Sequence, residues 1–216
     1  MKEYIDIHTH KEVPGSIAIA NRHAQFEQAN NGTYRSLGIH PWHVDENSFD
    51  SLYDDLCKYA TLPNVLAIGE CGLDKVTSTD WSLQKDVFAK QIALANRLQK
   101  PLIIHCVRAY TEVLQMLEMY RVSVPVIFHG FNKSTQLAKQ ITGSGYYISL
   151  GAALLKEGSN AIEVIKDIAP DKIFLETDDA DVAIQDIYAA ASAILKCDED
   201  SLILQLRENF QTAFGI

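Results

Sequence analysis

Residues 4–10 of the chain read YIDIHTH, and this alternation of side chains predicts a β-strand. Side chains two residues apart in a strand point to the same face, so His8 and His10 are expected to project together, within reach of one metal ion. Neutral imidazole suits zinc and similar divalent ions, but such an ion needs further His or carboxylate ligands from elsewhere in the fold. The alternative is that two exposed histidines follow a strand and bind nothing. Whether they form part of a metal site depends on whether the rest of the chain supplies further ligands.

Short apolar runs recur along the chain, and from its middle onward each is followed by a turn and a stretch with helical periodicity. This alternation predicts a parallel sheet. The expected strands are Tyr4–His8, Ser16–Ala20, Tyr34–Ile39, Val65–Gly69, Leu102–His105, Pro125–His129, Tyr146–Leu150 and Lys172–Glu176. The expected later helices are Trp81–Gln99, Tyr110–Tyr120, Ser134–Thr142, Ala161–Ile168, Val182–Leu195 and Glu199–Phe214.

Eight strands alternating with helices predict an α/β fold of the (β/α)8 TIM-barrel type, although 216 residues are few against the ~250 typical of that fold. The connections are shortest near the N-terminus, where Lys11–Gly15 leaves room only for a turn and Gln25–Asn30 for barely two helical turns. We therefore expect a reduced first quarter of the barrel and an extra C-terminal helix packed against it. No linker rich in Pro, Gly or Ser interrupts the chain, so residues 1–216 are expected to form a single domain.

The composition is that of an ordinary globular protein, with 47% hydrophobic and 22% charged residues. The formal net charge of −9 argues against a broad nucleic-acid-binding surface, though not against a local site where metal ions supply positive charge. Four scattered cysteines, without a CxxC pair or a secretory leader, predict a reduced cytoplasmic location. No apolar run approaches the ~20 residues of a membrane-spanning helix, so no membrane association is expected.

Residues able to bind metal stand at the ends of the expected strands. In barrels of this type the carboxyl ends of the strands carry the catalytic groups. Buried carboxylates and imidazoles cost free energy unless they are paired or bound to a metal, so these residues predict a coordination cluster. The expected ligands of two divalent ions are His8, His10 and Asp178 for one, His105 and His129 for the other, and Glu70 bridging both. Two ions about 3.5–4 Å apart activate a water molecule, and the chemistry this predicts is hydrolysis.

Each of these residues also has a structural alternative. His105 can be a satisfied core histidine, Glu70 a helix cap or the partner of a lysine, and Asp178 the N-cap before Val182. All of these alternatives must hold together to remove the site. His40 is expected to face the metals indirectly or to contact a substrate phosphate, with a structural role in its His-Pro turn as the alternative.

The remaining candidates lie farther from the expected site. For His43, as for His40, both a role at the site and a structural role in the turn are considered. His23 is expected at the surface. Strand alternation turns Cys71 and Cys106 away from the neighbouring ligands, so these two thiols are expected to take part in packing.

A series of short motifs runs nearly from end to end. They are DIHTH at 6–10, GIHP at 38–41, AIGECGLD at 67–74, PLIIHC at 101–106, HGF at 129–131, LETD at 175–178 and ENF at 208–210, with Gln84, Phe88 and Gln91 between them. Because it carries these motifs in this order, the chain resembles the TatD-related family of metal-dependent hydrolases. Members of this family are often described as DNases, and it lies within the amidohydrolase-like barrel superfamily.

The resemblance implies a (β/α)8 barrel and the same six metal ligands, with Glu70 where other barrel hydrolases use a carbamylated lysine. It also implies hydrolysis of a phosphodiester in DNA by a metal-activated hydroxide. Asp178 would orient or deprotonate the attacking water, so Asp178 and Glu70 are the expected catalytic residues. The two ions are expected to be Zn, Mg or Mn, since mixed His and carboxylate ligands accept several divalent metals.

Departures from the family pattern lie where substrate is expected to bind. Val107 replaces an arginine, Lys75 replaces an aromatic residue, and Asp179-Ala180-Asp181 replaces a small residue and proline. The candidate substrate contacts are His40, Arg108 and Lys133, with solvated loop charge as the alternative for the two cations.

The expected substrate is therefore DNA or a small phosphoester, and no obligate protein partner is inferred. The alternative function is metal-dependent hydrolysis of a small amide, lactone or phosphoester. A barrel that serves only as a binding scaffold is a third hypothesis, which the complete ligand set disfavours.

Overall fold

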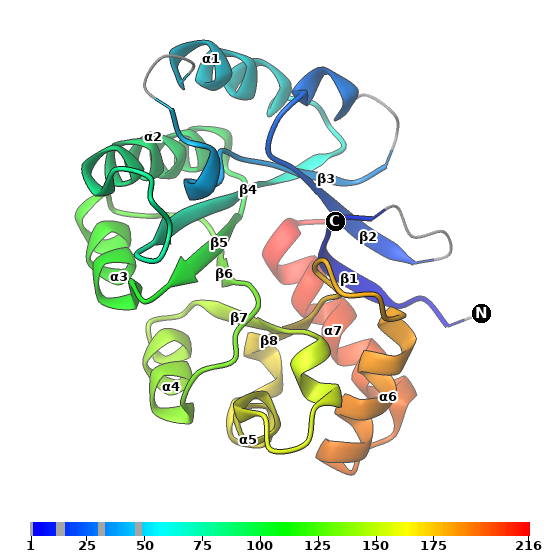
Figure 1. Ribbon diagram of the computed structural model, residues 1–216. Helices are drawn as coiled ribbons and strands as arrows, with labels where there is room; N and C mark the ends of the chain where they lie inside the picture. Colours follow the sequence, from blue (N-terminus) through cyan, green and yellow to red (C-terminus); the bar gives the residue numbers. More distant parts are fainter. Residues whose placement is uncertain (1, 12–15, 30–32, 46–48) are drawn as a thin grey trace. The chain divides into compact units, whose positions relative to one another are not determined.

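The computed structural model describes residues 2–11, 16–29, 33–45 and 49–216 (Figure 1). Its eight strands form one sheet in the order of the sequence, β1 to β8, and helices alternate with them from β3 onward. The paired strands run parallel, as between β4 and β5 or β7 and β8. The fold is a (β/α)8 barrel, which confirms the prediction made from the alternation of strands and helices.

The element bounds follow the expected ones closely. The strands are β1 (Ile5–Thr9), β2 (Ile17–Arg22), β3 (Arg35–Leu37), β4 (Val65–Asp74), β5 (Leu102–Val107), β6 (Val126–Phe128), β7 (Tyr147–Leu150) and β8 (Ile173–Leu175). The α-helices are α1 (Phe49–Tyr59), α2 (Trp81–Leu98), α3 (Tyr110–Met119), α4 (Thr135–Gly143), α5 (Asn160–Asp167), α6 (Ile184–Leu195) and α7 (Glu199–Phe214). The 3-10 turns are η1 (Phe26–Ala29), η2 (Pro41–His43), η3 (Ala152–Leu155) and η4 (Pro170–Lys172).

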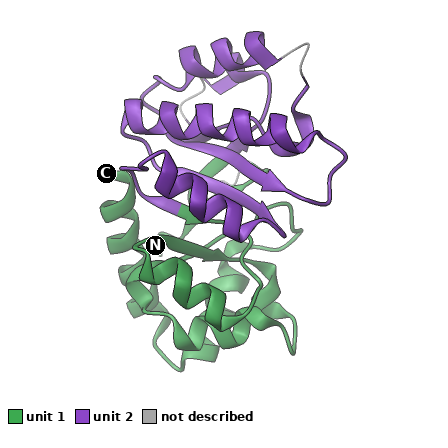
Figure 2. Ribbon diagram, turned by 90° about the vertical axis from the view of Figure 1, so that its left-hand side faces the viewer, with its two compact units in different colours: residues 1–20, 127–216 green, residues 21–126 purple. Residues whose placement is uncertain are grey.

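The chain divides into two compact units, one formed by residues 1–20 and 127–216 and the other by residues 21–126 (Figure 2). In the first unit the last strand meets the first. The N–H of Asp178 donates to the carbonyl of His8 at 2.9 Å, and the N–H of His10 donates to the carbonyl of Asp178 at 3.1 Å. These bonds place the residue that follows β8 directly beside the end of β1. The expected single domain stays a prediction.

The extra C-terminal helix is present in this first unit. α7 contacts β1, β8 and η4 (Figure 1). The Asn209 side-chain amide donates to the carbonyls of Pro170 and Ile173, at 2.7 and 2.8 Å. Because Asn209 is buried and both carbonyls are backbone groups, these bonds fix α7 to the start of β8.

In the second unit, β4 is longer than the sequence predicts. It runs to Asp74 with every residue buried, whereas the expected strand ends at Gly69. A Cβ atom at Gly72 would lie 2.0 Å from the His105 carbonyl, and its φ is +142°. A Cβ atom at Gly69 would likewise lie 2.5 Å from the Ile103 carbonyl oxygen. Gly69 and Gly72 thus mark the close approach of β4 to β5 rather than a turn.

The first quarter of the barrel is reduced, as expected, and one helix after β3, α1, is missing from the expected helices. η1 is a single 3-10 turn, shorter than the two turns allowed for it. α1 covers 49–59, and its apolar residues Phe49, Leu52 and Leu56 recur at helical spacing, so the pattern for this helix is present in the sequence although it is not among the expected helices. The expected turn at Lys11–Gly15 falls mostly outside the described residues. No helix in the described part of the chain has the length and apolar character needed to cross a membrane.

Candidate functional site

His8, His10 and Asp178 gather at one point of the first unit. His8 and His10 lie on the same side of β1, as their spacing predicts, and the carboxylate comes from the residue after β8. The His8 Nε2 and His10 Nε2 atoms lie 3.5 and 3.4 Å from Asp178 Oδ1. Both distances exceed those of ordinary N–H···O hydrogen bonds. They match the ~3.3–3.5 Å that separates two ligand atoms on one tetrahedral ion with metal–ligand distances near 2.1 Å.

The surroundings of Asp178 favour its ionised form. Burial alone would raise the pKa of this carboxyl, but the ring nitrogens of His10 and His8, together with nearby His129, lower it well below its usual range. An ionised carboxylate beside two imidazoles is the donor set expected for a divalent ion. The side chain is 36% exposed while that of His8 is fully buried, so the cluster is reached from the Asp178 side.

A buried hydrogen-bond network holds this cluster in place. The Asp6 carboxylate accepts from the Thr177 N–H at 3.0 Å and from the Thr177 hydroxyl at 2.6 Å. Burial raises the pKa of Asp6 to about 6, against the opposing effect of the Thr177 bonds. Since Asp6 precedes His8 on β1 and Thr177 precedes Asp178, these bonds fix both sides of the cluster.

His129 and Glu176 extend the same unit's set of ligands. The His8 and His129 rings lie 4.3 Å apart, and His129 Nδ1 lies 3.5 Å from Glu176 Oε1. Glu176 also accepts a hydrogen bond from the Gly130 N–H at 2.6 Å and another from the Ser149 hydroxyl. His129, Glu176 and Asp178 form a second group with ligand atoms within 4.8 Å of one another. Glu176 therefore positions His129, a role that sequence reasoning did not assign.

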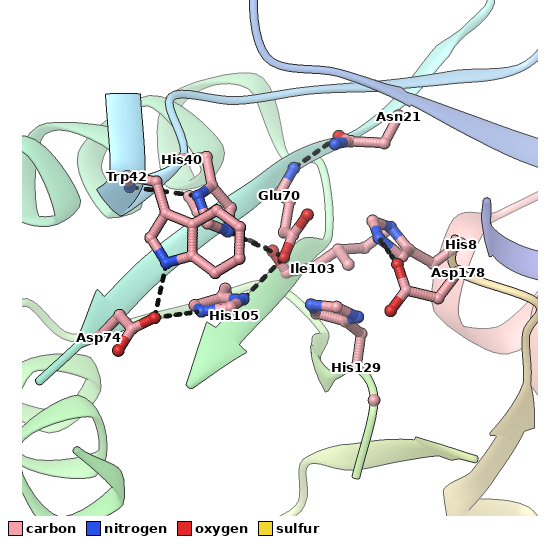
Figure 3. Close-up of polar contacts among 12 residues, drawn as sticks. His8, Asn21, His40, Trp42, Glu70, Asp74, Ile103, His105, His129 and Asp178 are labelled. Atoms are coloured by element: carbon pink, nitrogen blue, oxygen red, sulfur yellow. Dashed lines mark hydrogen bonds and ion pairs between the residues drawn. The ribbon is translucent and has the colours of Figure 1, made fainter. Parts of the chain in front are cut away.

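The second unit holds a separate cluster around Glu70 (Figure 3). Glu70 Oε1 lies 2.8 Å from His105 Nδ1 and 3.2 Å from His40 Nε2, and all three side chains are largely buried. Burial lowers the pKa of His40, although Glu70 acts in the opposite direction. His40, Glu70 and His105 thus form a group able to hold a metal ion, and the contact of His40 with substrate stays a prediction.

His105 faces a carboxylate with each ring nitrogen. Its Nδ1 contacts Glu70, and its Nε2 lies 3.2 Å from Asp74 Oδ2. A neutral imidazole carries only one N–H and donates to only one of the two carboxylates, whereas a cation between one nitrogen and its carboxylate satisfies both contacts. The second arrangement is that of a histidine ligand oriented by an outer carboxylate, and the donors present fit a divalent ion.

Asn21 and Trp42, which are not candidate metal ligands, support the Glu70 cluster through hydrogen bonds. The Asn21 side-chain oxygen accepts from the Glu70 N–H at 2.7 Å and from the Ser36 hydroxyl at 3.1 Å. The Trp42 indole N–H donates to Asp74 Oδ2 at 2.6 Å (Figure 3). Burial would raise the pKa of Asp74, but the bond from Trp42, the Val76 N–H and His105 lower it overall.

Two glutamines on one face of α2 clamp the backbone that carries these groups. Gln91 Oε1 accepts from the Ile39 N–H at 2.7 Å, and its amide donates to the Ile39 carbonyl at 3.0 Å. Gln84 makes the same pair of bonds with Asp74, at 2.9 and 3.1 Å. The backbone next to His40 and the backbone of Asp74 are therefore fixed by buried side-chain amides.

Comparison with known proteins identifies the family of the chain. The family model described as TatD related DNase matches residues 15–215. The chain belongs to this family. It is 35% identical over 151 residues to an uncharacterized metal-dependent hydrolase of Bacillus subtilis, YabD, covering 67% of this chain and 58% of the relative. It is 31% identical over 150 residues to the 3′-5′ ssDNA/RNA exonuclease TatD of Citrobacter rodentium, covering 67% and 56%.

Solved structures show the same fold. The TatD homolog YjjV of Escherichia coli superposes with a TM-score of 0.85 at 22% identity, over 99% of this chain and 98% of that one. A TatD family hydrolase of Entamoeba histolytica gives 0.84 at 17% identity, over 99% and 98%. The matched segments span less than two thirds of the curated relatives, 58% of YabD and 56% of the C. rodentium exonuclease.

The expected cationic substrate contacts of this TatD-family chain lie at the surface. Arg108 and Lys133 are exposed, and their contact with substrate stays a prediction. Lys75 pairs with Glu112 and lies over the Trp81 ring.

Two of the structural alternatives for Asp178 and Glu70 do not match the contacts of the described residues. The N-cap of α6 is Ala183, so Asp178 does not cap that helix. Glu70 pairs with histidines rather than a lysine. Of the two remaining histidines, His23 is half-buried and stacks on exposed His43 at 4.5 Å.

The thiols flanking the ligands are packed as predicted. Cys71 and Cys106 are buried, and the Cys71 thiol donates to the Ile103 carbonyl at 3.7 Å. Burial raises the pKa of the Cys71 thiol far above its ordinary value, so this sulfur stays protonated.

Proposed function

We propose that the chain is a divalent-metal-dependent hydrolase of the TatD type that cleaves phosphodiester bonds, with DNA as its substrate. The observation that carries the proposal is the 3.4–3.5 Å spacing of His8 and His10 from Asp178, which suits ligands of one ion better than hydrogen-bonded partners. The proposal keeps two divalent ions, with Glu70 among the residues that would hold them. Relatives named as metal-dependent hydrolase and as ssDNA/RNA exonuclease support it.

Each cluster contributes a defined part of the chemistry. Bound divalent ions would lower the pKa of water and polarise a phosphoryl oxygen. His8 and His10 hold the ligand nitrogens at a fixed separation on β1, and His40, Glu70 and His105 form the donor set of the other unit.

Asp178 is the residue suited to handle the attacking water. Its carboxylate is ionised and partly exposed, so one oxygen is able to accept a hydrogen bond, and then a proton, from a water molecule. The Asp6–Thr177 bonds hold the backbone that carries it. Orientation before reaction reduces the entropy lost in reaching the transition state.

A second candidate function keeps the metals and changes the substrate. The net charge of −9 and the exposed carboxylates of Asp179 and Asp181 disfavour a long polyanion and favour a small amide, lactone or phosphoester. Salt separates the two functions. DNA cleavage that depends on phosphate contacts falls steeply as salt rises, whereas turnover of a small neutral substrate changes little.

The test is hydrolysis of single-stranded DNA and of a panel of small esters by the metal-loaded protein. Glu70→Gln and His105→Ala are expected to reduce turnover by roughly a hundredfold or more, because loss of a group that stabilises transition-state charge has effects of that size. Glu163→Gln, on the exposed face of α5, is the matched control. Unchanged turnover in both site variants at full metal loading would refute the proposal. A cytoplasmic location and the lack of an obligate protein partner stay predictions.

A further inference from the structure

Trp42 is a large aromatic residue that is exposed yet rigidly held. Its side chain is 58% exposed, although tryptophan is usually well buried. Its backbone N–H donates to His40 Nδ1 at 3.1 Å, and its indole N–H donates to Asp74 at 2.6 Å. Pro41 at the start of η2 restricts the backbone as well. The ring therefore presents a face to solvent at little cost in side-chain entropy.

Asp74 holds a second exposed apolar residue beside the first. Its Oδ2 accepts from Trp42, and its Oδ1 accepts from the Val76 N–H at 2.7 Å. Val76 is 62% exposed. One buried carboxylate thus anchors two apolar residues at the surface, which a role in core packing does not require.

The position of the ring ties it to the ligand cluster of the same unit. The Trp42 ring lies edge-on to His40, with centroids 4.9 Å apart, and 5.8 Å from the His105 ring (Figure 3). His40 and His105 form the ligand group with Glu70. A phosphodiester bound at that group would have its attached sugar and base within reach of the exposed indole.

The charge of the chain adds an independent reason for such a contact. A protein with a net charge of −9 gains little from general attraction to a phosphate backbone. Stacking of bases on an aromatic ring does not depend on net charge, and it requires the unpaired bases of a single strand. We propose that Trp42 is a stacking platform for a nucleobase of the substrate, so that the protein prefers base-bearing phosphodiesters to abasic ones. This inference rests on the function proposed above.

The experiment uses Trp42 as its own reporter. The chain has two tryptophans, so Trp81→Phe leaves Trp42 as the single tryptophan. The Mg²⁺-loaded protein is titrated with a short oligothymidylate bearing phosphorothioate linkages, which resist cleavage, and with an abasic oligomer of the same backbone. We expect the base-bearing oligomer to quench Trp42 fluorescence and to bind on the order of tenfold or more tightly than the abasic one.

Two variants separate stacking from structural support. Trp42→Phe keeps a ring without the indole N–H and should retain most of the preference for the base-bearing oligomer. Trp42→Ala should abolish that preference, and Val76→Ala should leave it largely intact. Equal binding of the two oligomers by the Trp81→Phe protein, or absence of quenching by either, would overturn the inference. An equal loss of affinity for both oligomers in Trp42→Ala would also overturn it, since Trp42 would then only hold Asp74.

The outcomes also distinguish this inference from the proposed function. Cleavage of DNA and of abasic oligomers at the same rate would keep the hydrolase proposal and refute stacking. Base-dependent quenching without cleavage of any phosphodiester would refute the hydrolase proposal and keep the nucleobase contact. Should Trp42→Ala fail to fold by circular dichroism, the comparison of oligomers on the Trp81→Phe protein and on Trp42→Phe still decides.

Discussion

Gln91 offers a sharp test of how the Glu70 cluster is built, because its side chain is fully buried and makes two hydrogen bonds to one residue. Its amide pairs with both the N–H and the carbonyl of Ile39, at 2.7 and 3.0 Å, and Ile39 precedes His40. Gln91→Met keeps the length and nearly the volume of the side chain but removes both bonds. Two buried backbone groups are then left without their partners.

The expected cost follows from those two groups. A buried polar group left unsatisfied costs about 1–3 kcal/mol, so the free energy of unfolding should fall by roughly 2–5 kcal/mol. For a chain of this size, that corresponds to a decrease in Tm of about 5–15 °C. Gln91→Glu should be at least as destabilising, because it places a carboxylate oxygen against the Ile39 carbonyl.

The assay is equilibrium unfolding in urea, followed by circular dichroism. The midpoint should move while the slope m stays constant, since the surface exposed on unfolding is unchanged. Gln140→Met, on the exposed side of α4, is the matched control and should stay within about 0.5 kcal/mol of wild type. A Gln91→Met midpoint equal to that of the control would refute the view that this amide clamps Ile39.

Three further predictions concern the first unit, the metals and the thiols. Thr177→Val removes the 2.6 Å bond to buried Asp6 and should cost about 2–3 kcal/mol by urea unfolding, while exposed Thr212→Val should cost far less; equal shifts would contradict the Asp6 network. A divalent ion at about 100 times its Kd should stabilise the folded protein by about 2.7 kcal/mol, and thermal melts with and without chelator should show this in wild type and much less in His10→Ala. Ions that leave the wild-type melt unchanged would count against the ligand clusters. A thiol reagent should modify exposed Cys197 first and buried Cys71 only after unfolding; early labelling of Cys71 would show that β4 is open to solvent.

The sequence was sufficient for the order of the eight strands and of the helices from α2 onward, and for naming most candidate ligands. Apolar runs and helical periodicity are local properties, and each strand is built from residues that are adjacent in the chain. The pairing of His8 with His10 follows from the two-residue period of a strand, without any long-range contact. The short motifs around Glu70, His105 and Asp178 made the family recognisable for the same reason.

The partners of those ligands depended on contacts between distant segments. Gln91 is hydrogen-bonded to Ile39, 52 positions away in the sequence, and Trp42 is hydrogen-bonded to Asp74, 32 positions away. Glu176 stands beside a predicted ligand, yet its bonds to Ser149 and Gly130 come from other strands. Nothing in the local pattern distinguishes such residues from ordinary buried or exposed polar groups.

The full length of β4 was hidden for a related reason. Gly69 and Gly72 read locally as turn residues, but both lie within β4. Glycine is needed there because a Cβ atom at either position would collide with β5. The sequence by itself indicated most of the residues able to bind a metal and the strands that carry them, since these depend on side-chain type and local period. Only the tertiary structure decided how β4 continues to Asp74, how the glutamine amides hold the backbone, and why Trp42 is exposed beside His40 and His105, because hydrogen-bond partners and close strand packing are set by the register of segments far apart in the chain.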